Sequence, residues 1–350
     1  MKKTLFILTA IIACLFLVAV FAAAYVIFLP NTKNKTDVTI TIPWNTDYEQ
    51  LLDTLEAHDI LRNEETFDMV AHYMKYKTIR VGNYTIQPGM SNVKLVRLLR
   101  AGQHYPVKFA FNNIRTLDQL ANRAGKVFFF DEEELSELLH DTEFLRQYNV
   151  NEETCPCLFI PNSYELYYDI TPEGFVEKFH QFYQQFWNEQ RQKQAEEIGL
   201  TPAEVTTLAS IVEEENFRPQ EKAIIAGLYI NRLHKNMLLQ SDPTVKFALG
   251  DFARQRILLA DLKVDSPYNT YMYKGLPPGP IRFPEGSTID SVLHYTHHDY
   301  LYMCAKEDFS GYHNFTSSAA VHERIKLHHR HADVGELEIH VTRACVLRIG

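Results

Sequence analysis

The feature that most constrains this chain is an apolar segment close to its N-terminus. Leu5 to Leu29 contains no charged residue, and Lys2 and Lys3 precede it. A helix of roughly 20 apolar residues crosses the hydrocarbon core of a bilayer, so this segment is long enough to span a membrane once. A signal peptidase could cut after the small residues Ala22–Ala24, but the segment from Tyr25 to Leu29 that follows them is still apolar. We therefore expect a retained anchor and not a cleaved signal peptide.

Composition and charge restrict what the rest of the chain can do. The 350 residues suffice for two or three domains with sizeable cores. The net charge is -9, with no long basic run, which argues against a nucleic-acid partner. Lys33 and Lys35 lie beyond the apolar segment, so charge alone does not fix its orientation. A single N-terminal anchor usually leaves the body outside the cytoplasm, and we expect a periplasmic body on the inner membrane.

The segment from Thr201 to Asn216, TPAEVTTLASIVEEEN, predicts a helix with a well-defined start. Thr201 can act as the N-cap, Pro202 occupies the first helical position, and Glu204 completes the pattern of a capping box. Apolar residues then recur at helical spacing: Val205, Leu208, Ile211 and Val212.

Three glutamates end this predicted helix, and their positions on it differ. Glu215 follows Leu208 by seven residues and falls on the same apolar stripe, whereas Glu213 and Glu214 are expected to point toward solvent. Burial of a carboxyl group raises its pKa, which is what a general acid needs near neutral pH. Acids at a helix C-terminus oppose the helix dipole, so their placement does not favour stability. We select Glu215 as the catalytic candidate and Glu213 as the runner-up; solvated acids at a helix end are the alternative.

Strand and helix patterns divide the chain further. Val38–Ile42 alternates as a strand does and leads into a helical pattern, and a similar strand-to-helix pattern begins at Val107. Long helices are expected over Phe128–Leu145, Gly174–Ile198 and Pro219–His234. We expect an α+β protein with the following parts: a cytoplasmic tip and anchor (1–30), a linker (31–37), a small β-α module (38–106), a second β-α module or connector (107–154), a mixed domain (155–332) and a short tail (333–350).

Cysteines and histidines give no metal-binding pattern. The chain has five cysteines: Cys14, Cys155, Cys157, Cys304 and Cys345. Four of them lie outside the predicted anchor, and the sequence does not choose among their three possible pairings. His322-Glu323 is followed by His328, which is too late for a zinc-binding HExxH motif. We therefore expect neither a metal nor a cofactor.

Six short motifs resemble, in the same order, those of the MltG-type (YceG-like) endolytic murein transglycosylases. They are LASIVEEEN, YINRLHKNMLLQSDPTV, SPYNTY, GLPPGPI, YLYMCA and HNF, the last followed by His322. Residues 38–106 resemble a LysM-like module, with Gly82-Asn-Tyr-Thr-Ile and Gly89-Met-Ser typical of it. The N-terminal anchor fits as well, so the resemblance covers nearly the whole chain. It implies a LysM-like module followed by a lysozyme-like, YceG-like catalytic domain.

The resemblance also implies an activity. Members of the family are membrane-anchored enzymes that cut nascent peptidoglycan strands between MurNAc and GlcNAc, leaving 1,6-anhydro-MurNAc ends and ending strand elongation. The family's catalytic glutamate is the second one in S-I-V-E-x-E, which corresponds to Glu215 here. Cell-wall synthases would be partners. Two departures are Asn216, where the family commonly has a small residue or threonine, and Pro156-Cys157, where it tends to have Glu-Gly.

Candidate substrate-binding residues lie in the loops after the key helix: Gln240, Asp242, Tyr268, Asn269, Tyr271 and His313. Amide and carboxyl groups could hold sugar hydroxyl and N-acetyl groups, and the tyrosine rings could stack on sugar faces. Each of them could equally stabilise a turn or fill the core. His313 is selected because it lies in a motif, Gly311-Tyr-His-Asn, that resembles the family's.

Two other functions remain open. A hydrolytic muramidase needs a second carboxylate near the first, and Asp242 is the residue that the sequence offers. A non-catalytic peptidoglycan-binding scaffold for cell-wall synthases would explain the anchor and the module equally well. The apolar position of Glu215 argues against a scaffold.

Overall fold

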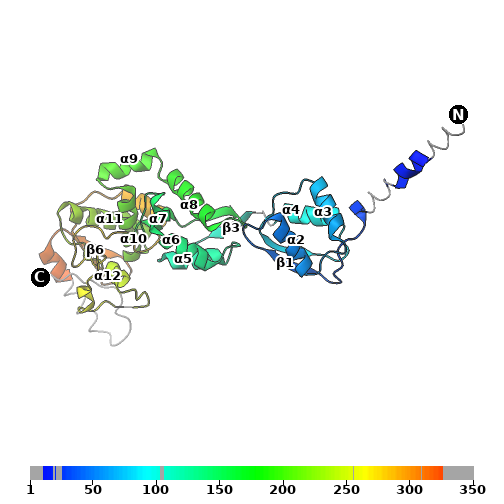
Figure 1. The fold of residues 1–350 in the computed structure, drawn as a ribbon. Coiled ribbons are helices and arrows are strands. Elements are labelled where there is room, and N and C mark those ends of the chain that lie inside the picture. Colours follow the sequence, from blue (N-terminus) through cyan, green and yellow to red (C-terminus); the bar gives the residue numbers. More distant parts are fainter. Residues whose placement is uncertain are drawn as a thin grey trace. The chain divides into compact units, whose positions relative to one another are not determined.

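The computed structural model describes residues 11–18, 20, 26–102, 106–254, 256–308 and 310–325, and Figure 1 labels many of their helices and strands. The described chain is mostly helical, with three sheets of two strands each, so a mixed α+β fold is confirmed. It forms two compact units. The first contains the described residues up to Val107 together with Leu166–Ile170, and the second contains Lys108–Glu165 and the described residues from Thr171 onward.

The predicted anchor and tail lie mostly outside this description. Only parts of Leu5–Leu29 are described, and the tail at 333–350 falls outside entirely. Among the described residues, no helix combines the length and the apolar character needed to cross a bilayer.

The first unit is a two-stranded ribbon covered by three helices: β1 (Val38–Ile42), α2 (Tyr48–Ala57), α3 (Glu64–Tyr73), β2 (Gly82–Ile86) and α4 (Asn92–Ala101). The strands are antiparallel, with Val38 opposite Ile86. Ile40 and Ile42 are buried while the intervening Thr41 is exposed, as the alternation predicts. Asn31, in the segment interpreted as a linker, is buried, and its amide donates to the side chain of Asn92 at 2.6 Å.

The second unit holds the other helices and a further sheet. Its helices are α5 (Leu117–Gly125), α6 (Glu132–His140), α7 (Thr142–Arg146), α8 (Pro172–Phe186), α9 (Glu189–Ile198), α10 (Pro202–Glu215), α11 (Pro219–His234), α12 (Asp242–Ala248) and α13 (Gly286–Leu293), with short 3₁₀ turns η1 (Cys155–Leu158) and η2 (Asp261–Lys263). Strands β5 (Tyr302–Ala305) and β6 (His313–Thr316) pair antiparallel. The third sheet pairs β3 (Pro106–Ala110) with β4 (Ser163–Tyr167), and the division of the chain into units falls within both strands.

Two long predicted helices are each broken in two. The helix expected over Gly174–Ile198 ends after α8, where Trp187 is buried, and restarts as α9. The side chain of Asn188 accepts a hydrogen bond from the Arg191 amide, which caps the new helix. The helix expected over Phe128–Leu145 is likewise split into α6 and α7, with Asp141 as the N-cap of α7.

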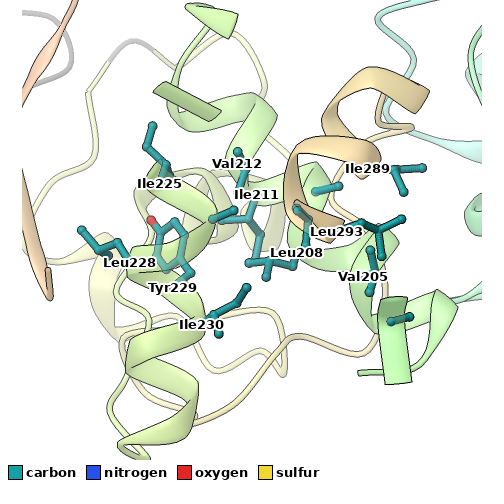
Figure 2. Packing of buried hydrophobic residues seen from close by; sticks show 14 of the residues in the cluster. Val205, Leu208, Ile211, Val212, Ile225, Leu228, Tyr229, Ile230, Ile289 and Leu293 are labelled. Atoms are coloured by element: carbon teal, nitrogen blue, oxygen red, sulfur yellow. The ribbon is translucent and has the colours of Figure 1, made fainter. Parts of the chain in front are cut away.

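Helix α10 lies in the middle of the second unit. Its apolar side chains pack against those of α11 and α13, as Figure 2 shows for Ile211, Tyr229 and Ile289. Every residue from Val205 to Glu214 is buried. The expectation of one apolar stripe and one solvated face is therefore wrong, because neighbouring elements cover this helix on all sides.

Candidate functional site

The start of α10 is fixed by the capping box that the sequence predicts. The Thr201 hydroxyl accepts from the Glu204 amide at 3.3 Å, and the Glu204 carboxylate accepts from the Thr201 amide at 2.8 Å. Pro202 occupies the first turn. These local bonds set the register of the helix, and Glu215 is its last residue.

The hydroxyl groups within α10 donate hydrogen bonds to backbone carbonyls of the same helix. The hydroxyls of Thr206 and Thr207 donate to backbone carbonyls one turn earlier, each at 2.8 Å. Ser210 donates to the Thr207 carbonyl and accepts from the Ile281 amide at 3.0 Å, which ties the GLPPGPI segment to this helix. In that segment Gly279 has no room for a side chain, since a Cβ there would lie 1.8 Å from the Glu153 carbonyl oxygen.

The expectation that Glu215 is the buried glutamate of the three is wrong, because Glu215 is partly exposed whereas Glu213 and Glu214 are buried. One of the Glu215 carboxyl oxygens is held by two hydroxyl groups. Oε1 accepts from the Tyr229 hydroxyl and from the Ser241 hydroxyl, each at 2.6 Å. In the described part of the chain, no residue donates a hydrogen bond to Oε2. The carboxyl group is thus fixed through one oxygen, and the other is left to exchange a proton with a ligand.

Both donors to Glu215 are themselves well fixed. Tyr229, from α11, is 2% exposed, and burial followed by the negative charge of Glu215 raises the pKa of its phenol well above the usual value. It therefore stays protonated and donates. Ser241 is fully buried, and its amide donates to the Thr270 hydroxyl at 3.0 Å.

A second carboxyl group lies close enough to Glu215 for their charges to interact. Asp242, the first residue of α12, accepts from the Tyr271 hydroxyl at 2.6 Å. Desolvation, with a further contribution from the Glu215 charge, raises the pKa of Asp242 to about 6, although the Tyr271 hydrogen bond opposes this. The site thus holds one carboxyl group that is partly protonated near neutral pH.

This raised pKa predicts a pH-dependent stability effect. An acid with a folded pKa of about 6 and an ordinary value of 3.8 binds more protons when folded, so stability falls as pH rises through that window. We expect Asp242→Asn to raise the free energy of unfolding at pH 7 by about 1–2 kcal/mol, and to give no gain near pH 4. Urea unfolding at both pH values measures this. Asp265→Asn is the matched control, because Asp265 accepts from Tyr273 at 2.6 Å but is exposed; a similar gain there would contradict the explanation.

Buried hydrogen bonds tie the two loops that carry these groups. The Gln240 amide donates to the Thr270 carbonyl at 3.0 Å, and the hydroxyls of Thr244 and Thr270 lie 2.8 Å apart. Arg232, 1% exposed, donates to the Leu239 carbonyl at 2.7 Å. The segment that carries Ser241 and Asp242 is therefore held against the segment that carries Tyr271.

The other predicted loop residues have different surroundings. Gln240 is partly exposed beside Ser241, with a left-handed backbone at φ 53°. Asn269 is fully buried, and its amide donates to the carbonyls of Leu262 and Val264 at 3.0 and 2.8 Å. Its side chain therefore fixes the loop. Tyr268 packs its ring 4.7 Å from that of Phe247, against the core.

His313 belongs to a second polar cluster, which also contains Glu221 and Asn216, the residue that follows Glu215 in the chain. Its Nδ1 lies 2.8 Å from a carboxylate oxygen of Glu221, which is 5% exposed. The Asn216 amide donates to the same oxygen at 2.5 Å. Because a carboxylate only accepts, the imidazole donates through Nδ1 to Glu221. The cluster joins β6 to the ends of α10 and α11.

Glu213 and Glu214 do not face solvent as expected. They are 5% and 9% exposed, and both pair with Arg282, at 3.3 and 2.6 Å. Arg115 adds a contact to Glu214 at 2.8 Å. The Glu213 carboxylate also accepts from the Thr288 hydroxyl at 2.6 Å. Their predicted exposure is thus wrong, because the fold buries both carboxylates beside cations and hydrogen-bond donors.

The described residues contain no group of three His, Cys, Asp or Glu side chains that could hold a metal ion. Cys304 is disulfide-bonded, whereas Cys155 and Cys157 are free thiols buried in η1. Burial raises the pKa of the Cys157 thiol to about 12, so it stays protonated.

Comparison with known proteins gives consistent matches over most of the chain. A model of the YceG-like family matches residues 40–327. A Bacillus subtilis protein named endolytic murein transglycosylase is 27% identical over 316 residues, covering 84% of this chain and 85% of that protein. A Streptococcus pneumoniae serotype 2 protein of the same name is 27% identical over 310 residues, covering 79% of this chain and 55% of its own length. A crystal structure titled as a putative yceG-like protein from Listeria monocytogenes is 26% identical, with a TM-score of 0.55 over 83% of this chain and 99% of that one.

Proposed function

Because this chain belongs to the YceG-like family, we propose that it is a membrane-anchored, endolytic lytic transglycosylase of peptidoglycan. Similar proteins carry the name endolytic murein transglycosylase. The observation that carries the proposal is the carboxyl group of Glu215, held through Oε1 by Tyr229 and Ser241 while the group remains partly exposed. A fixed, accessible carboxyl group is what a single acid–base catalyst requires.

The proposed reaction needs only this one carboxyl group. Glu215, protonated on Oε2, donates to the oxygen that joins MurNAc C1 to GlcNAc, and the C1–O bond breaks. The resulting carboxylate accepts the proton of the MurNAc C6 hydroxyl, whose oxygen attacks C1 and closes a 1,6-anhydro ring. Glu215 ends protonated as it began, and no water is consumed.

The surroundings of the runner-up support this choice of glutamate. Glu213 has one oxygen beside Arg282 and the other engaged by the Glu285 amide at 2.9 Å and by Thr288. A carboxylate neutralised in this way is poorly placed to deliver a proton.

A hydrolytic muramidase is the second candidate, and Asp242 favours it. This carboxyl group interacts with Glu215 and has a pKa of about 6, so it could activate a water molecule. Product analysis separates the two reactions. The full chain, incubated with uncrosslinked glycan strands, should release internal fragments that end in 1,6-anhydro-MurNAc. Reducing ends in their place would establish the muramidase.

The hydroxyl donors to Glu215 give a further prediction. Tyr229→Phe removes one hydrogen bond to the Glu215 carboxyl group, which is charged between the two proton transfers, and keeps the ring in its buried position. Such bonds are worth about 1.5–3 kcal/mol, so the turnover rate should fall about tenfold or more. Tyr300→Phe, at a tyrosine that is 38% exposed, is the control. Equal rates for Tyr229→Phe and the parent protein would show that this bond does not position the catalyst.

Localisation is part of the same proposal. The apolar segment Leu5–Leu29 would hold the protein in the inner membrane, with the body in the periplasm near cell-wall synthases. Mass analysis of membrane-extracted protein should find that segment intact. A mature N-terminus near Tyr25 would reject the anchor and leave the enzymatic proposal untouched.

A further inference from the structure

A hollow lies in the same compact unit as Glu215, and Glu215 is not among its lining residues. It has a volume of about 820 Å³, and its lining includes Phe111, Asn112, Asn162, Tyr164, Phe182 and Phe186. Phe111, Asn112 and Asn162 flank β3 and β4, Tyr164 lies in β4, and Phe182 and Phe186 belong to α8. The segment Leu158–Tyr164 holds the sequence LFIPNSY, which the proposed reaction does not use.

We propose that this hollow binds a saccharide segment of the glycan strand, away from the bond that is cut. This inference rests on the proposed function and adds a remote binding site to it. The volume lies within the range of about 300–1,000 Å³ typical of small-ligand sites, which commonly combine aromatic walls with a few polar groups.

The aromatic wall is only partly covered by the protein. Tyr164, Phe182 and Phe186 are each partly exposed. The rings of Tyr164 and Phe182 lie 4.6 Å apart at an angle of 27°, so they form a fixed, nearly parallel pair. A sugar ring presents C–H groups on its faces, and these pack on aromatic side chains while the hydroxyl groups at the ring edge find polar partners.

Two side-chain amides supply those partners. Asn112 and Asn162 are exposed at the hollow. The Asn162 side-chain oxygen accepts from the Ser163 backbone amide at 2.7 Å. Among the described residues, neither the Asn162 side-chain nitrogen nor the Asn112 side-chain amide has a hydrogen-bond partner. Both amides can therefore hold hydroxyl or N-acetyl groups of a ligand.

The charges around the hollow favour a neutral sugar over a stem peptide. Arg123 is the positive residue of the lining, and its Nε and Nη2 already donate to the Ala110 carbonyl at 3.2 and 3.1 Å. Glu285 is a negative residue of the lining. With one cation and one anion the lining has no net charge, so it offers a stem peptide rich in carboxylates no net attraction.

The hollow is joined to the catalytic helix by direct bonds. Glu285, at the N-terminus of α13, borders the hollow, and its amide donates to the Glu213 carboxylate at 2.9 Å. Glu213 precedes Glu215 by two residues on α10. A strand held in the hollow would therefore be held on the same packed elements as the catalytic carboxyl group. Binding energy from a remote, non-reacting part of a substrate can then support the reaction, which favours long strands.

Photo-crosslinking of the full chain in detergent tests this site. The probe is chitohexaose with a photoreactive group at its reducing end, and the protein carries Glu215→Gln so that cleavage plays no part. Peptide mapping should find crosslinks in residues 158–164 or 182–186. Asn112→Ala combined with Asn162→Ala should lower their yield at limiting probe about fivefold or more. Gln190→Ala, at an exposed amide on α9 outside the lining, should leave the yield unchanged.

A second variant and a second probe complete the test. Ser287→Trp fills the hollow from an exposed position on α13 and should give the same loss if the amide variants fold poorly. Crosslinks confined to residues 240–271 would overturn the remote site and leave the proposed function standing. Labelling of the hollow by a photoreactive stem peptide, but not by the saccharide, would overturn the assignment to sugar.

Discussion

Replacing Glu215 by glutamine is expected to lower the rate of anhydro-product formation by ~10⁴-fold or more, the upper part of the range for general acid–base catalysis. The amide keeps the size of the side chain and can still accept from Tyr229 and Ser241 at Oε1. It has no proton to transfer to the glycosidic oxygen, and one residue serves both half-reactions. Product formation is measured by chromatography of anhydro-muropeptides at equal concentrations of folded protein.

The matched control for this variant is another acid on the same unit. Glu197→Gln changes an exposed carboxylate on α9 and should leave the rate unchanged. Unfolding of the Glu215→Gln protein at the parent's urea midpoint would show that the fold is intact. If Glu215→Gln stays active while a folded Glu213→Gln protein is inactive, the assignment of the catalyst to Glu215 is wrong.

Loss of Arg282 is expected to have the largest effect on stability. Its side chain is 6% exposed and contacts both Glu213 and Glu214. Arg282→Met leaves two buried carboxylates with fewer partners, and removing one member of a buried ion pair typically costs about 3–5 kcal/mol. The free energy of unfolding from urea titration should fall by this amount.

Two further variants identify the cause of that loss. Arg254→Met removes a pair with Asp251 and Asp261 at a side chain that is 31% exposed, and should change stability far less. Adding Glu214→Gln to Arg282→Met removes one of the stranded charges, so part of the lost stability should return. A double variant no more stable than Arg282→Met alone would mean that lost packing, and not stranded charge, causes the effect.

The sequence by itself determined the local elements of this protein. Thr201, Pro202 and Glu204 predicted where α10 begins, and the alternation over Val38–Ile42 predicted a strand with one buried face; the structure confirms both. Capping bonds and helical periodicity join residues within three or four positions, so the chain needs no distant partner to express them. Helical periodicity also selected Glu215, whereas the motif that contains Ser241 was noted only through the family resemblance, and its role beside Glu215 was not predicted.

Only the tertiary structure decided what surrounds these elements. The sequence placed Glu213 and Glu214 in solvent because they fall off the apolar stripe of the helix. The fold instead buries them and brings Arg282 and Arg115, which are distant in the chain, into contact with them. It also brings Tyr229 from the next helix to Glu215.

Helix breaks show the same limit. Aromatic spacing continues through Trp187, yet α8 ends there, because burial of that ring and the cap at Asn188 outweigh the periodic pattern. Burial, ion pairing and hydrogen bonds between distant residues depend on which elements pack together. These contacts depend on the sequence of the whole chain, so no short segment of it predicts them.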